Sequence, residues 1–528
     1  MKNTSVILLL SSIVLLISCR NTNQTAAIKH PEGKLVSSTY KEPVFLNDQR
    51  ISKIKGIESE LEQIFIEHSK TKKIPGIAYG IVVDDSLVIA SATGLSQIKN
   101  NIAASTSTSF RIASMSKSFT AMAILKLRDE QKLSLNDPVS KYIPELGKLE
   151  YLTEDSPLID IENLLTMTAG FPEDNPWGDR QLALSDEAFI DLISKGLSIS
   201  KVSSSQFEYS NTGYAMLGKI ITSISGIPYQ EYIKKHIFLP LGMNNTFWEY
   251  SNVPQEQLAI GYRWEDETWK KEPMLHDGAY GAMGGLITSI EDFNKYVSFH
   301  LSAWPARSDD DTGPIKRSSL REMHTPQFNF LNSWNKDWDN KSCASMIGYG
   351  FGLGISMDCK RRKRISHGGA LPGFGSNYAF FPEYGIGIMA FGNLTYTTPI
   401  PYDTIEKMLF EKLDLQSRKL PASDILEKRK GEIANLFQTG KANLDGKIFA
   451  ENFFLDTSKE MRIKEIQDVL DSAGGFINVL KISPRNQLRG DFKISCENGD
   501  INVFFTLTPE KTPMVQRLDV SFKSRKSE

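Results

Sequence analysis

The sequence predicts an α/β protein of the α+β type, with two groups of strands separated by a long helical region. Residues 77–83 and 87–90 are rich in β-branched residues and flank the turn 84–86, which predicts a β-hairpin. A second group at 351–357, 364–369, 376–381 and 386–391, whose first two members flank a turn at 358–360, predicts an antiparallel meander. Between the two groups, apolar residues recur at helical spacing among many turns, which indicates a mostly α-helical insertion.

Length and charge narrow the classes of protein that this chain can belong to. A chain of 528 residues is too long for one typical core and predicts two or three domains, one of them large. The formal net charge is −2, with both signs interspersed, which gives no reason to expect a nucleic-acid partner. The basic run 360–364 is short, and we interpret it as a solvated hairpin turn and not as a binding patch.

The first residues predict export. Lys2 precedes an apolar run from Val6 to Ile17, which is too short to span a bilayer but suits a signal peptide at residues 1–18. The run ends in Leu-Ile-Ser-Cys19, which resembles the lipobox of bacterial lipoproteins and implies lipidation of Cys19. We therefore expect a lipid-anchored protein of the bacterial cell envelope, facing the periplasm or the cell exterior. The alternative is an ordinary signal peptide with an unrelated cysteine.

Composition shifts along the chain predict its domains. Residues 19–52 are polar and read as a tether, 53–416 as the main domain, 417–430 as a linker and 431–528 as a small accessory α+β domain. The accessory domain holds no catalytic motif, so substrate positioning, wall binding and dimerisation all stay open. Cys343 and Cys359 are the cysteines close enough in sequence to suggest a disulfide, and no His/Cys spacing suggests a metal site or a cofactor.

The first candidate catalytic motif is Ser114-x-x-Lys117. Apolar residues recur at helical spacing from Met115 onward, so Ser114 opens a buried helix and Lys117 lies one turn further along. A lysine desolvated in such a helix can have its pKa lowered enough to accept the serine proton. Ser-x-x-Lys also occurs elsewhere, for example at Ser69, and the alternative here is an ordinary helix start; the apolar helix is what distinguishes Ser114.

The second motif is Tyr209-x-Asn211, which precedes another apolar helix. A phenol beside a cation can accept or donate a proton, and the amide of Asn211 can bind a substrate carbonyl and hold the lysine. The same pattern occurs at Tyr250-x-Asn252, where Pro254 follows and predicts a loop. We favour Tyr209 because a buried helix can hold its phenol in place.

The third motif is His367-Gly-Gly369-Ala370 on a predicted strand. Its glycines allow a substrate backbone to lie against the strand, and an N–H near Ala370 is a candidate oxyanion donor. A separate glycine-rich segment, 281–285, has two interpretations, a phosphate cradle or close backbone packing. Packing is favoured because the Lys-Ser/Thr ending of a phosphate loop is missing. Thr288 or Ser289 is expected to cap the helix that follows.

Taken together, these three motifs resemble those of class C β-lactamases and the related penicillin-binding proteins, over about residues 53–415. The resemblance implies an antiparallel sheet packed by helices, with an all-α lobe and the site between them. It implies Ser114 as the acylated nucleophile, Lys117 and Tyr209 as the proton-transfer pair, and Asn211, His367, Gly369 and Ala370 as substrate-binding residues. The N–H groups of Ser114 and Ala370 would form the oxyanion hole.

Two departures from the family pattern shape the expected function. His-Gly-Gly replaces the lactamase Lys-Thr-Gly and is more similar to the form found in D,D-carboxypeptidases, D-aminopeptidases and esterases. A lysine carries a fixed charge for a β-lactam carboxylate, whereas a histidine is charged only in part near neutral pH, so we do not expect efficient lactamase activity. Relatives often carry a histidine where this chain has Met167.

We expect an envelope serine hydrolase that acts through an acyl-enzyme on an amide or ester, with D-alanyl peptides of peptidoglycan as one candidate substrate. The alternatives are a carboxylesterase or D-aminopeptidase-like hydrolase, a weak class C-type β-lactamase and a non-catalytic wall-binding lipoprotein. The expected partners are a small-molecule or peptide substrate and the membrane, with no nucleic acid and an open oligomeric state.

Overall fold

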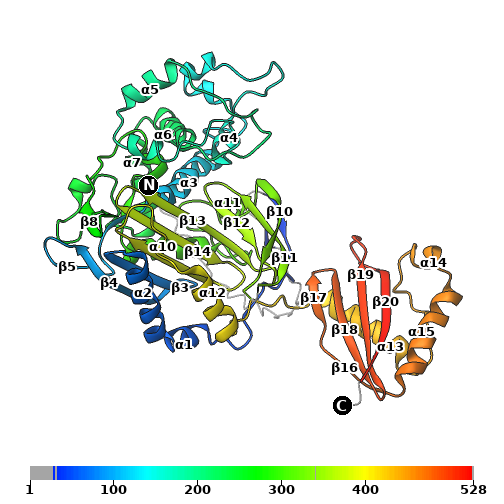
Figure 1. Ribbon diagram of the computed structural model, residues 1–528. Helices are drawn as coiled ribbons and strands as arrows, with labels where there is room; N and C mark the ends of the chain where they lie inside the picture. The colour runs from blue at the N-terminus through cyan, green and yellow to red at the C-terminus, as the bar shows by residue number, and fades with distance from the viewer. Residues whose placement is uncertain (1–27, 30–32, 339, 526–528) are drawn as a thin grey trace, which may run out of the picture. The chain divides into compact units, whose positions relative to one another are not determined.

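A nine-stranded antiparallel sheet forms the centre of the larger of two units in this chain, as a computed structural model shows for residues 28–29, 33–338 and 340–525 (Figure 1). The predicted hairpin and the predicted meander meet in this sheet, because β15 pairs with β3. The strands, in the order in which they lie side by side, are β10 (Phe328–Lys336), β11 (Ser342–Tyr349), β12 (Gly354–Met357), β13 (Lys363–Leu371), β14 (Phe374–Phe381), β15 (Ile386–Gly392), β3 (Gly76–Val83), β4 (Ser86–Gln97) and β5 (Ile102–Ala103).

Helices cover both faces of the sheet, which explains why its central strands are buried throughout. On β3, Tyr79 and Ile81 join a core with Leu61 of α2 (Glu58–Lys72), whereas Ala78 and Val82 join a separate core. This alternation follows from the period of two in a strand. Helices α1 (Arg50–Lys55), α2 and α12 (Tyr402–Lys407) belong to the first face, and α10 (Ile290–Ser302) packs on the second.

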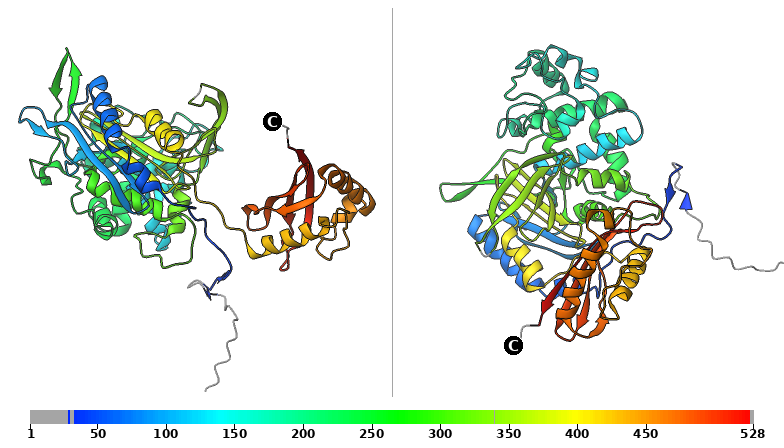
Figure 2. Two further views of the ribbon diagram at one scale, coloured as in Figure 1. Left: turned by 90° about the horizontal axis from the view of Figure 1, so that it is seen from below. Right: turned by 90° about the vertical axis from the view of Figure 1, so that its right-hand side faces the viewer.

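A helical lobe follows the first hairpin, as the sequence predicts, and lies at the top of Figure 1 and of the right-hand view of Figure 2. The lobe and its surroundings contain α3 (Ser116–Asp129), α4 (Ile161–Leu165), α5 (Asp186–Ser194), α6 (Asn211–Ser225), α7 (Tyr229–Ile233), α8 (Leu239–Leu241), α9 (Gly281–Gly284) and α11 (Arg317–Met323). Two-stranded pairings of β6 (Phe110–Arg111) with β9 (Ile287–Thr288) and of β7 (Tyr262–Glu265) with β8 (Thr268–Lys271) complete this region. Helix α3 packs against α6 and α9, so the first two motifs lie on neighbouring helices.

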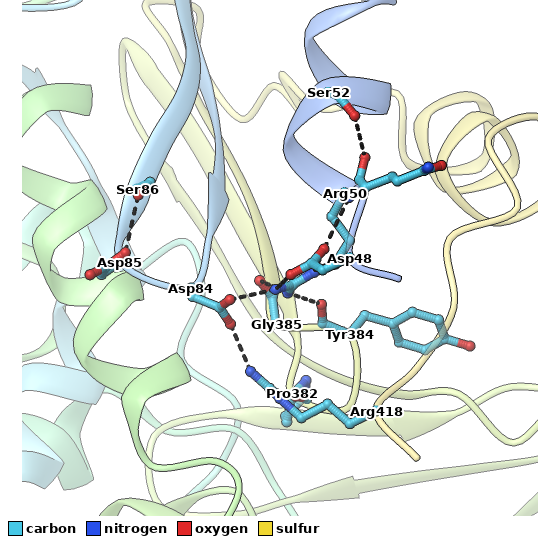
Figure 3. A network of polar contacts seen from close by, with 11 residues as sticks. Asp48, Arg50, Ser52, Asp84, Asp85, Ser86, Pro382, Tyr384, Gly385 and Arg418 are labelled. Atoms are coloured by element: carbon cyan, nitrogen blue, oxygen red, sulfur yellow. Dashed lines mark hydrogen bonds and ion pairs between the residues drawn. The ribbon is translucent and has the colours of Figure 1, made fainter. Parts of the chain in front are cut away.

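An ion-pair network joins the two ends of this unit to the first hairpin (Figure 3). Asp84, in the turn between β3 and β4, contacts Arg50 at 2.6 Å and Arg418 at 2.7 Å. Both guanidinium groups are largely buried, and Asp48 supplies a second carboxylate to Arg50 at 2.7 Å. Residues up to Lys419 therefore belong structurally to the sheet unit.

The basic run 360–364 is a solvated hairpin turn only in part: Lys360 and Arg361 are exposed between β12 and β13, as predicted, but the next residues are not. Arg362 is buried, pairs with Asp358 at 2.6 Å and lies over the ring of Trp338, while Arg364 pairs with Glu406 at 2.9 Å. The guanidinium groups of Arg362 and Arg364 meet aromatic rings that only the folded chain brings to them, which is why sequence alone suggested solvent exposure. A disulfide between Cys343 and Cys359 ties this turn to β11.

Among the described residues, the second unit comprises residues 420–525 together with residues 28–29 and 33–41. Helix α13 contributes Leu426, Ile433 and Phe437 to the core of this unit, so the compact unit begins eleven residues before the predicted boundary at 431. The core is built from α13 (Asp424–Phe437), α14 (Phe453–Asp456), α15 (Lys459–Ala473), β16 (Phe476–Val479), β17 (Ser483–Asn486), β18 (Arg489–Cys496), β19 (Gly499–Leu507) and β20 (Val515–Ser524), and β1 (Ile28–Lys29) pairs with β2 (Leu35–Val36).

The predicted signal peptide and Cys19 lie outside the described residues. Among the helices that the structure does describe, none combines the length and the apolar character needed to cross a membrane.

Candidate active site

Ser114 lies in a tight turn between strand β6 and helix α3. The turn is the 3-10 helix η1 (Ala113–Met115), and Ala113 has a positive φ of 50°. A non-glycine residue in this left-handed region costs on the order of 1–3 kcal/mol and persists only where its surroundings hold it. The hydroxyl of Ser116 supplies one such restraint, because it donates to the Ala113 carbonyl at 2.7 Å and accepts from the Leu286 N–H at 3.1 Å.

Strand β13 holds the same turn from the other side. A Cβ at Gly369 would lie 2.1 Å from the Ile112 carbonyl oxygen, so any side chain there would push the strand away from the turn. Ser376 of β14 donates to that same carbonyl at 2.7 Å. The sequence suggested that the glycine makes room for substrate; the structure shows that it also lets the third motif pack directly against the turn that carries Ser114.

Lys117 is buried one helical turn beyond Ser114 and touches three acceptors. Its Nζ lies 3.0 Å from Ser114 Oγ, 2.7 Å from Asn211 Oδ1 and 2.9 Å from the Met283 carbonyl oxygen. Met283 belongs to the glycine-rich segment, where Gly281 and Gly285 allow close packing around Asp277. The glycine-rich segment therefore packs closely against its neighbours, as predicted, and its Met283 carbonyl accepts a hydrogen bond from Lys117. Ser289 caps the following helix α10.

Burial gives Lys117 the protonation behaviour of a base. Loss of hydration lowers the pKa of Lys117 to about 7, although the nearby carboxylates of Asp179 and Asp174 oppose the shift. In the neutral form, two N–H bonds can donate to Asn211 and Met283 while the lone pair faces the Ser114 hydroxyl. A serine with such a partner has a route for its proton to leave.

Tyr209 lies beside both groups. Its ring centroid is 4.9 Å from the Lys117 Nζ, and its hydroxyl hydrogen-bonds to Ser114. Burial raises the pKa of Tyr209 well above that of a free phenol. Tyr209 therefore remains protonated near neutral pH, which suits it to donate a proton, whereas Lys117 is the group able to accept one.

The turn that carries Tyr209 is held by caps on helix α6. Asp174 accepts from the backbone N–H groups of Asn211 at 2.7 Å and Thr212 at 2.8 Å, and Ser210 caps the helix start. Met167, buried in the position for which the sequence gave no role, accepts from the Ser210 N–H through its sulfur at 3.3 Å. Met167 thus supports the position of the Tyr209 turn.

Asn211 is fully buried, and both atoms of its side-chain amide form hydrogen bonds within the protein. Its Oδ1 accepts from Lys117, and its Nδ2 donates to Asn175 Oδ1 at 2.6 Å. The predicted role in holding the lysine is therefore visible. Asn211 is not among the residues that line the cavity, and its substrate contact stays a prediction. Asn175 lies on the cavity wall instead.

Tyr250, the alternative tyrosine, points to a different environment. It begins the 3-10 helix η6 (Tyr250–Asn252), and its hydroxyl contacts His276 Nε2 at 3.1 Å. It does not line the cavity that contains Ser114. The geometry thus favours Tyr209 as the member of the motif that adjoins the serine.

His367 forms part of the cavity wall as a neutral ring. Its Nδ1 lies 2.6 Å from the Gly368 carbonyl and so carries the hydrogen, and its Nε2 lies 3.2 Å from the Tyr349 hydroxyl, which donates to it. Burial and the nearby Lys117 charge lower the pKa of His367 to about 4. The predicted partial charge at neutral pH is therefore absent, and the ring presents no cation to a substrate.

These groups surround a cavity of about 550 Å³. Ser114, Tyr209, His367, Gly369 and Ala370 all line it, so the structure brings the three motifs together. Strand β13 pairs with β12 only as far as Ser366, which leaves its 367–371 segment without a neighbour on that edge. The assignment of each residue to catalysis or substrate binding stays a prediction.

The cavity also contains residues that the sequence did not single out. Asn175 and Asp179 come from the loop before α5, and Tyr396 comes from the segment after β15. None belongs to a motif, and the polar residues around Pro176 resemble any surface loop. Only the fold brings them to within reach of Ser114.

Comparison with known proteins assigns the class that this fold and site define. The Beta-lactamase family model matches residues 61–409, and the chain belongs to this family of penicillin-binding protein homologues and class C-like serine hydrolases. Protein flp of Staphylococcus aureus (strain MW2) is 30% identical over 345 residues, which cover 62% of this chain and 62% of flp. Beta-lactamase-like protein 2 of Dictyostelium discoideum is 29% identical over 327 residues, or 59% of each chain. The alignments thus span about three-fifths of these relatives.

Solved structures confirm the fold. The octameric penicillin-binding protein homologue from Pyrococcus abyssi superposes with a TM-score of 0.56 at 23% identity and covers 88% of this chain and 98% of its own. The penicillin-binding protein from Bacillus halodurans gives a TM-score of 0.52 at 21% identity, with 65% of this chain and 98% of its own covered. At such identities the likeness extends to the fold alone.

Proposed function

We propose that this chain is an active serine hydrolase of the bacterial envelope that cleaves an ester or amide through an acyl-enzyme on Ser114. One observation carries the proposal: a lysine with its pKa lowered to about 7 lies 3.0 Å from the hydroxyl of a serine at the wall of a cavity. Family membership supports the reaction class.

The proposed reaction begins with proton transfer from Ser114 to neutral Lys117 as the serine oxygen attacks the substrate carbonyl. The N–H groups of Ser114 and Ala370 are the proposed donors to the resulting oxyanion. Tyr209 then delivers a proton to the leaving group, and the acyl-enzyme forms as that group departs. Water attacks the acyl-enzyme in the second half of the reaction, with the same groups acting in reverse.

The neutral state of His367 bears on the substrate. A β-lactam or a peptide that ends in D-alanine carries a carboxylate. In class C β-lactamases, a lysine at the position that corresponds to His367 supplies a positive charge for that carboxylate. Here the corresponding ring is uncharged, with both nitrogens already bonded. This supports an esterase or an aminopeptidase-like activity over efficient hydrolysis of β-lactams or of peptides that end in D-alanine.

Labelling tests the proposed function. A fluorophosphonate should add to the intact protein once, as measured by mass spectrometry, and Ser114→Ala should abolish the adduct. Ser69→Ala is a matched control, because Ser69 also precedes a lysine by three residues but lies on helix α2. Labelling that persists in Ser114→Ala would refute the assignment of the nucleophile.

We also propose that the protein is anchored to a membrane through lipidated Cys19, on the basis of the lipobox-like residues before it. Cys19→Ala should release the protein from the membrane fraction and change its electrophoretic mobility. A variant that stays membrane-bound with unchanged mobility would contradict the proposal.

A further inference from the structure

The cavity beside Ser114 has an uneven charge distribution. Asp179, in the 3-10 helix η4 (Gly178–Gln181), lines it. Of the described side chains on the cavity wall, Asp179 is the one carboxylate, and neither a lysine nor an arginine is among them. The wall therefore offers a single formal charge to a substrate, and that charge is negative.

The carboxylate of Asp179 is not fully satisfied by the protein. The residue is 2% exposed, and its Oδ1 has no hydrogen-bond partner in the described part of the chain. Tyr396, also on the cavity wall, supplies a hydrogen bond to the carboxylate. A buried carboxylate oxygen without a donor is costly, so a donor brought by a ligand would be stabilised strongly at this position.

Neighbouring cations do not meet this requirement. Lys117 attracts Asp179 when it is protonated, but its Nζ contacts three other acceptors and leaves Asp179 Oδ1 without a donor. Arg180, next in the chain, is half-exposed, and its guanidinium lies 4.0 Å from Glu272. Neither residue is on the cavity wall.

Other acids strengthen the negative field. Asp174 and Glu173, close in sequence, act electrostatically on Tyr209 in the same sense as Asp179. His367, also on the wall, adds no cation, because burial lowers its pKa to about 4. Because the described cavity wall carries one carboxylate and no cation, it would repel a carboxylate-bearing substrate and attract an ammonium group.

We propose that Asp179 selects substrates that carry a primary ammonium group, so that the enzyme acts on amine-bearing esters or amides in preference to neutral or carboxylate-bearing ones. The ammonium donates to Asp179 Oδ1 when the substrate carbonyl reaches Ser114. This inference rests on the proposed function, because it names the substrate class of the same site.

Matched substrate pairs test the selection. On the acyl side, the pair is alanine 4-nitroanilide, as both enantiomers, and its N-acetyl derivative. On the leaving-group side, the pair is 4-(aminomethyl)phenyl acetate and 4-(hydroxymethyl)phenyl acetate. The measured quantity is the ratio of kcat/KM within each pair, which is insensitive to the amount of active enzyme. We expect the amine to be preferred about 10–100-fold in at least one pair, because a hydrogen bond to a charged group has that weight.

The variant Asp179→Asn keeps the shape of the side chain and removes its charge. It should reduce the preference in that pair to about threefold or less, whereas Glu173→Gln, which removes a nearby acid outside the cavity wall, should retain it. The comparison separates a specific contact from the general field. Melting temperatures of both variants establish that the ratios describe folded protein.

The outcomes distinguish this inference from the proposed function. Ser114-dependent hydrolysis with no amine preference in either pair, or a preference that survives Asp179→Asn, would overturn the role of Asp179 and leave the serine hydrolase intact. An absence of Ser114-dependent labelling by the fluorophosphonate would overturn the proposed function itself.

Discussion

The pH dependence of hydrolysis should report the protonation of Lys117. With a pKa of about 7, the amine is neutral in about one-tenth of the molecules at pH 6 and in about nine-tenths at pH 8. Because the neutral form accepts the Ser114 proton, kcat/KM should rise about tenfold over this interval and level off above it. An exposed lysine, with a pKa near 10.4, would place the rise more than three pH units higher.

Lys117→Arg removes the base and keeps a cation at the same position. A guanidinium does not lose its proton near neutral pH, so kcat/KM for 4-nitrophenyl acetate should fall by about 10²–10⁴ and its rise near pH 7 should disappear. Lys126→Arg, on the same helix α3 but paired with Glu130, is the matched control and should keep the wild-type profile. A flat wild-type profile from pH 5.5 to 8, or an unchanged rise in folded Lys117→Arg, would refute the assignment of Lys117 as the base.

Three further predictions follow from the same geometry. Tyr209→Phe should lower kcat on an ester by about 10²–10⁴, while Tyr250→Phe should change kcat little. If steady-state kinetics give the reverse order, Tyr250 and not Tyr209 is the tyrosine that transfers the proton. Gly369→Ala should lower kcat/KM by at least about tenfold, because the added Cβ displaces the turn before Ser114; a structure of the variant with an unmoved turn would contradict this reasoning. His300 and His324 form a buried pair with ring nitrogens 2.7 Å apart, and burial lowers the pKa of both, that of His300 to about 3. The free energy of unfolding should therefore be highest above pH 6.5 and decrease as the pH falls toward 3, by up to ~1.4 kcal/mol per pH unit for each histidine. Urea denaturation that shows the same pH dependence after both histidines are replaced by apolar residues would exclude them as its source.

The secondary structure that positions the site could be predicted because its signals are local. The hairpin at 76–97 and the strands β12 to β15 alternate or follow turn residues over short spans, so the chain itself contains the information. Ser114 and Lys117 are one helical turn apart, and that spacing allows their 3.0 Å contact. The fold class, inferred from the three motifs and their order, is confirmed by the family and by the solved structures.

Other features of the site depend on contacts between distant segments. The low pKa of Lys117 requires burial among α3, α6 and α9, and the neutral state of His367 requires Tyr349 from another strand. Asn211 is part of the second motif, but its amide nitrogen donates to Asn175, and no pattern in the sequence connects these two residues.

The sequence by itself determined the nucleophile motif, its candidate tyrosine and the order of helices and strands, because these follow from residue type and short-range spacing. Only the tertiary structure decided the charge of the cavity. Protonation of a buried group depends on desolvation and on every charge within a few ångströms, and those neighbours come from segments far apart in the chain. Asp179 is the clearest case: in the sequence it is one acid among many, and in the fold it is the one carboxylate among the described residues that line the cavity beside Ser114.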